Sequence, residues 1–299
     1  MLFDTHCHLN FGSFDGKVDK VIDEAKKAGV NRIVIPGTDV PTSKKAVKIA
    51  EEFDGIYAAV GIHPHHIMQY QISNIKYQND ISNIKQDVIP AKAGIHFDLM
   101  QIEKLLQRPK VVAIGEVGID RHIYQKTKYP DYKIEGEFIE LQKIILQEQI
   151  GLAIEYDKSL VLHNREAKND MIKVLNNNWN KKLEGRSVFH CCEPDLELLE
   201  YAKNHKMFIG VDGDITYYKE KQEFIKNIPL EMLVLETDSP FLNPRLRQDF
   251  GGQAEPLKSK YNEPRNIPLI AEFIANLKNI SVEKLSKQTT ENARKLFRL

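Results

Sequence analysis

The sequence predicts an α/β fold, and within that class a single-domain (β/α)8 barrel of the TIM type. Eight short apolar runs alternate with segments of helical periodicity along the chain. Five of these runs end in His, Glu or Asp. Barrel active sites lie at the carboxyl ends of the strands, so the barrel explains these endings better than the alternative, an open doubly wound sheet.

The first apolar run leads into a His-x-His pattern, His6 and His8. Residues two apart in a strand point to the same side, so both imidazoles face one place, as a metal ion requires. Alone, the pattern is equally typical of polar residues leaving a strand. The later endings favour a metal site assembled on strand ends: Glu116, His163, His190 and Asp238.

Each element is expected from its own pattern. The predicted strands cover residues 2–6, 32–37, 56–61, 111–115, 159–162, 187–189, 207–211 and 232–235. Apolar residues at helical spacing predict a helix over 16–28 and a second helix that begins at a cap, Thr42 or Ser43. Further helices are predicted over 99–107, 135–156, 167–176, 196–202, 219–227, 264–277 and 281–297.

Two stretches break this alternation. Within 66–98, the sequence Ile-Ser-Asn-Ile-Lys begins at Ile72 and again at Ile81. Long connections are uncommon in compact domains, so we interpret 66–98 as an inserted low-complexity excursion within the domain 1–299, with little contact to the core. A substrate lid is the alternative. The second stretch, 243–263, is expected to overhang the site.

Composition limits the classes of function. The net charge is +0, from 42 basic and 42 acidic residues, which argues against capture of nucleic acid by overall charge. There is no signal-peptide pattern and no apolar run of about 18 residues, so we expect no membrane association. Three cysteines fit a reducing cytoplasm. We therefore expect a cytoplasmic protein, and a monomer.

Several longer motifs follow the predicted strands: Asp4-Thr5-His6-Cys7-His8-Leu9, Val60-Gly61-Ile62-His63-Pro64-His65, Gly115-Glu116-Val117-Gly118-Ile119-Asp120, His163-Asn164-Arg165, His190-Cys191, Glu236-Thr237-Asp238-Ser239-Pro240 and Asn262-Glu263-Pro264. With them the chain resembles the TatD family of metal-dependent deoxyribonucleases, within the amidohydrolase-like barrels. The resemblance covers the chain except about 66–98. It departs from the family at Cys191-Cys192-Glu193-Pro194 and at Asp212-Gly213-Asp214, which bears on substrate preference.

The resemblance implies two divalent metal ions. His6, His8 and Asp238 would hold one, His163 and His190 the other, and Glu116 would bridge them. Imidazole favours Zn²⁺ or Mn²⁺, whereas cellular abundance favours Mg²⁺. Two such ions can clamp the attacking and leaving oxygens of a phosphoryl displacement and activate water. Asp238 and Glu116 are the expected catalytic residues, with Asp238 as general base.

His63 and Arg165 are the expected substrate-binding residues. Arg165 lies two residues after His163, where its guanidinium can fork onto a phosphate. His63 is expected at the scissile phosphate or the leaving oxygen. The structural alternatives are a surface ion pair for Arg165 and a hydrogen-bonded loop histidine for His63. Further groove residues are expected among His65, Arg121, His122, Tyr124 and Asn164, and Tyr124 or Phe11 is a candidate for base stacking.

The expected reaction is hydrolysis of DNA phosphodiester bonds, with single strands or 3′ ends as substrate. The 3′-5′ exonuclease direction comes only from the family resemblance. The alternative is hydrolysis of another ester or amide, as by a tRNA deacylase, lactonase or dipeptidase. Relatives of that kind often bridge their metals with a modified lysine, whereas strand four here carries Glu116. A non-enzymatic scaffold is disfavoured by the complete ligand set.

Overall fold

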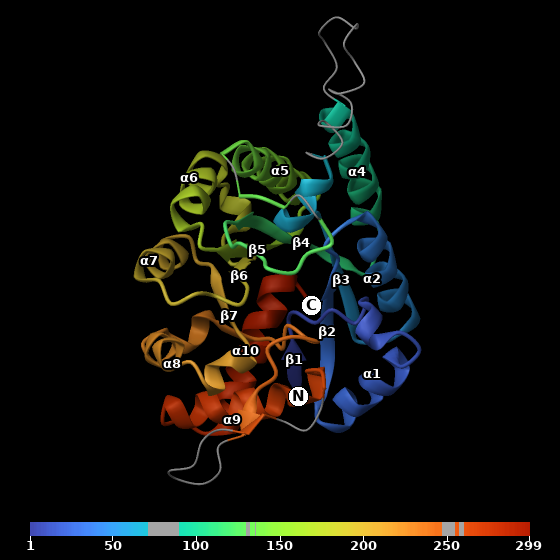
Figure 1. Ribbon diagram of the computed structural model, residues 1–299. Coiled ribbons are helices and arrows are strands. Elements are labelled where there is room, and N and C mark those ends of the chain that lie inside the picture. The colour runs from blue at the N-terminus through green and yellow to red at the C-terminus, as the bar shows by residue number, and fades with distance from the viewer. Residues whose placement is uncertain (71–89, 130–131, 135, 247–254, 257–259) are drawn as a thin grey trace, which may run out of the picture.

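The chain folds into one barrel of parallel strands surrounded by helices. The computed structural model describes residues 1–70, 90–129, 132–134, 136–246, 255–256 and 260–299. Within these residues, an eight-stranded sheet runs in the order β1-β2-β3-β4-β5-β6-β7-β8, and all its pairings are parallel. The helices form a ring around the strands (Figure 1). The predicted (β/α)8 barrel is confirmed.

The strands of the barrel are β1 (Leu2–Asp4), β2 (Val30–Pro36), β3 (Ile56–Val60), β4 (Val111–Asp120), β5 (Ser159–Arg165), β6 (Ser187–Phe189), β7 (Phe208–Val211) and β8 (Leu233–Leu235), and β9 (Arg245–Leu246) and β10 (Glu255–Pro256) form a separate antiparallel pair. The helices are α1 (Val18–Lys27), α2 (Val40–Glu52), α4 (Pro90–Leu106), α5 (Gly136–Glu155), α6 (Lys168–Asn178), α7 (Leu196–Asn204), α8 (Lys219–Lys226), α9 (Ile267–Leu277) and α10 (Val282–Phe297). None of the described helices has the length and apolar composition needed to cross a membrane.

Backbone hydrogen bonds bring the ends of β8 and β1 together and so close the barrel. Thr5 N donates to Leu235 O at 3.0 Å, and Asp238 N donates to His6 O at 2.9 Å. The buried Asp4 side chain reinforces this seam, because its Oδ2 accepts from Thr237 Oγ1 at 2.6 Å. His6 and Asp238, 232 positions apart in sequence, therefore lie side by side.

Two apolar layers hold the barrel. The larger lies between the strands and the surrounding helices. The smaller fills the barrel interior with one side chain or more from each strand and ends against α10, whose Phe297 ring lies 5.9 Å from that of Phe3. Figure 1 shows α10 across the centre of the ring. This end of the barrel is thus closed by apolar packing, which leaves the opposite end for chemistry.

Some element boundaries differ from those predicted. β4 and β5 continue to Asp120 and Arg165, so Glu116 and His163 lie within strands rather than after them. Helix α2 is capped by Asp39, whose Oδ1 accepts from Thr42 N at 2.9 Å, so Thr42 is the partner in the capping box and not the cap.

The stretch 66–98 is not clear of the core where the structure describes it. Helix α4 begins at Pro90, not at residue 99. Ile67, Met68, Tyr70 and Ile95 are buried in the main apolar layer. The expectation of little contact is therefore wrong for these flanks, because they carry apolar side chains that the barrel covers. Both copies of the Ile-Ser-Asn-Ile-Lys repeat lie outside the described residues, and the insertion itself stays a prediction.

Candidate metal centre

One group of ligand-type atoms gathers where β1 and β8 end. His6 Nε2 and His8 Nε2 lie 3.3 Å apart, and each faces Asp238 Oδ1, at 3.6 and 3.4 Å. Glu116 Oε2 completes the group, at 3.6 Å from His6 Nε2 and 3.4 Å from His8 Nε2. We call these four residues cluster A. The sequence predicted that these four residues contribute to one metal site.

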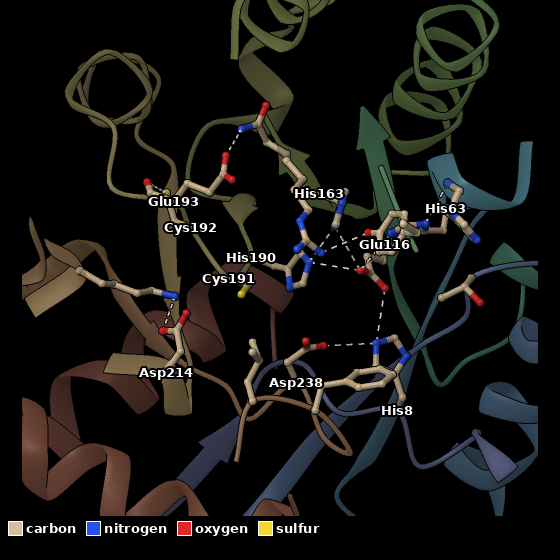
Figure 2. Close-up of a pocket in the computed structure, with 18 of the residues that line it drawn as sticks. His8, His63, Glu116, His163, His190, Cys191, Cys192, Glu193, Asp214 and Asp238 are labelled. Carbon is tan, nitrogen blue, oxygen red and sulfur yellow. Dashed lines mark hydrogen bonds and ion pairs between the residues drawn. The ribbon is translucent and has the colours of Figure 1, made fainter. Parts of the chain in front are cut away.

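The other oxygen of Glu116 faces a second group. Glu116 Oε1 lies 3.3 Å from His163 Nδ1, 3.2 Å from His190 Nε2 and 3.4 Å from His63 Nε2. We call Glu116, His163, His190 and His63 cluster B. Figure 2 shows Glu116 between His8 and Asp238 on one side and His163 and His190 on the other. One carboxylate therefore belongs to both clusters, in the position that the resemblance assigned to it.

The donor atoms of both clusters fit divalent cations. Neighbouring donors lie about 3.4 Å apart, the spacing of ligands roughly 2.0–2.1 Å from one tetrahedral ion. Burial and the nearby His190 lower the pKa of His6 to about 4, which leaves its ring neutral. Burial opposes ionisation of Glu116, but His63, His163 and His190 hold its pKa well below its usual range. A neutral imidazole and an ionised carboxylate are the forms that bind metal.

A buried carboxylate orients His163 from behind. Asp120 Oδ2 accepts from His163 Nε2 at 3.1 Å and from Tyr124 OH at 2.7 Å. Burial opposes ionisation of Asp120, but its hydrogen bond with His163 keeps its pKa well below its usual value. Burial opposes protonation of His163, but its hydrogen bonds with Asp120 and Glu116 raise its pKa to about 10, so a cation bound at this ring would have to displace a proton. Such carboxylate–imidazole pairs fix the orientation of metal ligands.

Two further buried carboxyl groups support the centre and were not predicted. Glu236 Oε1 lies 3.7 Å from His190 Nδ1, and burial together with Asp212 raises its pKa well above its usual range. Asp4 accepts from His6 N at 3.2 Å and Thr237 N at 3.0 Å, and burial raises its pKa to about 7. Both are thus tied to the segments that carry candidate ligands.

His63, which was expected to contact substrate, lies among the candidate ligands of cluster B. Its Nε2 is 3.4 Å from Glu116 Oε1 and close to the His163 ring, and its contact with substrate stays a prediction. Arg165 lines the pocket and its Nη1 donates to Tyr124 OH at 3.2 Å, and its contact with a phosphate stays a prediction. His66 is removed from both clusters, because its ring nitrogens face Tyr129 OH and Thr38 Oγ1, at 3.0 and 3.2 Å.

The clusters open into a pocket of about 750 Å³. Its lining includes parts of both clusters and the loops after several strands: His8, Phe11, His63, His65, Glu116, Tyr124, His163, Asn164, Arg165, His190, Cys191, Glu193, Asp214, Tyr218, Lys221, Asp238 and Phe241. Of the earlier candidates, Arg121 instead pairs with Asp170 and His122 with Glu166. Cys192 also lines the pocket, although it is buried, and its Sγ donates to Glu193 O at 3.4 Å.

Comparison with known sequences decides the family. The model of the TatD related DNase family matches residues 3–298. The chain belongs to this family. It is 34% identical, over the full length of both chains, to the uncharacterized metal-dependent hydrolase YabD of Bacillus subtilis. It is 31% identical, again over both full lengths, to the 3′-5′ ssDNA/RNA exonuclease TatD of Edwardsiella piscicida.

A solved structure agrees with this assignment. The TatD homologue YJJV of Escherichia coli superposes with a TM-score of 0.75 at 26% identity, covering 100% of this chain and 98% of that one. The protein is therefore an enzyme of the TatD type, a metal-dependent hydrolase. The clusters described above contain groups of His, Asp and Glu that could hold a metal ion.

Proposed function

We propose that this TatD-type enzyme hydrolyses DNA phosphodiester bonds with two divalent cations, one at each cluster. His6, His8 and Asp238 would hold one cation and His163 and His190 the other, with Glu116 shared. The observation that carries the proposal is the position of the Glu116 carboxylate between the clusters. Its two oxygens face separate groups of imidazoles at 3.2 to 3.6 Å. A pair of cations would satisfy these converging imidazoles and carboxylates at once.

The side chains take distinct roles in this proposal. Cations at the clusters would neutralise charge that develops on phosphoryl oxygens and promote ionisation of water. Asp238 would accept the proton of the attacking water, since its carboxylate lies at the exposed side of cluster A. Arg165 would bind a substrate phosphate through its guanidinium, which Tyr124 OH holds in the pocket wall.

The direction of attack and the strand preference are part of the proposal. A relative 31% identical to this chain is named a 3′-5′ ssDNA/RNA exonuclease. We extend that direction to this chain, with single-stranded 3′ ends as the preferred substrate. The size of the pocket supports the preference for single strands, because a space of about 750 Å³ takes a nucleotide or two rather than a duplex.

One assay tests the reaction. Single-stranded and double-stranded DNA, labelled at either end, is incubated with Mg²⁺, Mn²⁺, Zn²⁺ or EDTA. We expect stepwise shortening from the 3′ end that EDTA abolishes. Activity that survives complete metal removal would contradict the proposal, and so would hydrolysis of lactones, dipeptides or aminoacyl-tRNA without hydrolysis of DNA.

The variant Asp238→Asn makes the assay specific to the proposed centre. Loss of the carboxylate removes the general base and changes one ligand, so we expect turnover to fall by about 10²–10⁴-fold with the fold retained. Asp54→Asn, at an exposed position after α2, is the matched control and should keep wild-type turnover. Near-wild-type hydrolysis by Asp238→Asn would contradict the assigned role.

A further inference from the structure

The loop after β8 places an exposed aromatic ring beside cluster A. Phe241 is 51% exposed and lines the pocket. Its ring meets those of His8 and Phe11 edge-on, with centroids 6.3 and 6.2 Å away, and Phe11 stacks on His8 at 4.2 Å. We call these three rings the aromatic wall. It extends from a candidate metal ligand to the mouth of the pocket.

Buried hydrogen bonds fix Phe241 relative to Asp238. Phe241 N donates to Asp238 O at 2.9 Å, which closes a turn between the two residues. Asn262, fully buried, braces this turn: its N donates to Pro240 O at 3.1 Å and its Nδ2 to Thr237 O at 2.9 Å. The backbone of Phe241 is therefore held next to the candidate general base.

The charges around the pocket favour a neutral contact with substrate. Besides histidines, the cationic side chains among its described lining residues are Arg165 and Lys221. Lys221 is buried between Asp212 and Asp214, at 2.8 and 2.7 Å, so these carboxylates already balance its charge. Little cationic charge remains for a polyanion beyond Arg165 and the metal centre. Stacking on aromatic rings is the uncharged contact that nucleobases offer.

We propose that Phe241 stacks the base of a nucleotide flanking the cleaved bond, and that the enzyme thereby selects unpaired bases. This inference rests on the proposed DNA hydrolysis and names the feature of the substrate that the pocket recognises beyond its phosphate. A base within a duplex is paired and stacked on its neighbours, so it reaches Phe241 only after the end frays. A single-stranded end presents its base directly, whatever its sequence.

The test compares two single-stranded oligonucleotides that differ only at the nucleotides flanking the cleaved bond. One carries natural bases there and the other abasic tetrahydrofuran sugars. For the wild type we expect kcat/KM to favour the natural bases by about five- to 150-fold, the range that one stacked base provides. In Phe241→Ala this ratio should fall toward one. Phe241→Leu, which keeps apolar volume without a ring, should also lower it, and Phe241→Trp should preserve it.

Ile123→Ala is the matched control. Ile123 is 73% exposed and is not among the described residues that line the pocket, so its loss removes an exposed apolar side chain without touching the aromatic wall. We expect the wild-type ratio in this variant. A second readout needs no turnover: 2-aminopurine at the flanking position should be quenched on binding Asp238→Asn, and less on binding Asp238→Asn combined with Phe241→Ala.

The outcomes separate the two proposals. If the wild type cleaves both oligonucleotides equally well, or if Phe241→Ala keeps the wild-type ratio, the stacking role is wrong while DNA hydrolysis stands. If the metal-loaded wild type cleaves neither oligonucleotide, the proposed function itself is wrong, and the stacking role with it.

Discussion

Asp120 is expected to affect metal affinity although it lies outside clusters A and B. Its carboxylate accepts from His163 Nε2 and Tyr124 OH, and an Asn amide at this site can turn a donor toward His163. We expect Asp120→Asn to weaken metal affinity by about 10–100-fold, measured by calorimetric titration with Mn²⁺ or Zn²⁺. Asp54→Asn is the exposed control. Undiminished affinity with an intact fold would mean that Asp120 does not orient His163.

His66 is expected to make the protein sensitive to acid. Burial and the nearby His63 lower its pKa to about 3, from 6.5 in the unfolded chain. The unfolded state thus binds more protons between these values, so this contribution to stability is full above pH 6.5 and declines as pH falls toward 3. We expect His66→Gln to flatten the fall in Tm between pH 6.5 and 4.

The control for this measurement is His96→Gln, at an exposed position on α4. It should leave the dependence of Tm on pH as it is in the wild type. An equally steep fall in His66→Gln would show that other groups carry the acid sensitivity, His65 first among them, since burial and His63 lower its pKa to about 4.

The sequence predicted the candidate ligands of clusters A and B better than the buried carboxylates that contact them. The structure brings the six predicted ligands together, and their role as ligands stays a prediction. Asp120 was visible only as a motif residue, although its place four positions after Glu116 puts it on the same side of a strand. Asp4 and Glu236 could not be assigned, because their partners Thr237 and Cys191 are far away in sequence and meet them only when the barrel closes.

At the scale of elements, the last turn of α10 is expected to contribute much of what this helix adds to the stability of the protein. Phe297 is 3% exposed and packs against Phe3 in the barrel interior. We expect Phe297→Ala to lower the free energy of unfolding by about 3–5 kcal/mol, since it leaves a cavity there. Urea unfolding measures this change in free energy. The control is Val282→Ala, because Val282 lies on the same helix and is 37% exposed. A loss as small as the control's would show that the interior does not depend on α10.

Periodicity predicted the order of the elements but not all of their ends. The alternation of apolar runs and helical segments identified all eight strands of the barrel. The ends of β4 and β5 were placed too early, because Glu116 and His163 look like exits from a strand although the backbone pairing continues past them. Helix α4 was started too late, because the low-complexity sequence before residue 99 hides the apolar contacts of Ile95.

For the whole molecule, the charge balance predicts a weak dependence on salt. The net charge is +0, and of the two cations other than histidine among the described lining residues, Lys221 is paired with Asp212 and Asp214, which leaves Arg165. For each phosphate of a single strand that the protein neutralises, the logarithm of the association constant falls with a slope of about −0.7 against the logarithm of the salt concentration. We expect KM for single-stranded DNA to rise less than about fivefold between 50 and 200 mM KCl at constant Mn²⁺. A rise of a hundredfold would point to a cationic surface outside the pocket.

Glu116 serves clusters A and B with one rigid carboxylate, and this has a thermodynamic consequence. Turning the group to suit one cluster also moves the oxygen that faces the other. If each cluster holds a cation, as proposed, whatever one cation gains or loses when the other is bound, the other must gain or lose equally, because linkage between two ligands is reciprocal. Preorganisation of Glu116 by the first cation would favour entry of the second, while repulsion between like charges would oppose it. An affinity measured for either ion would then be a property of the pair, with meaning only at a stated occupancy of the other cluster.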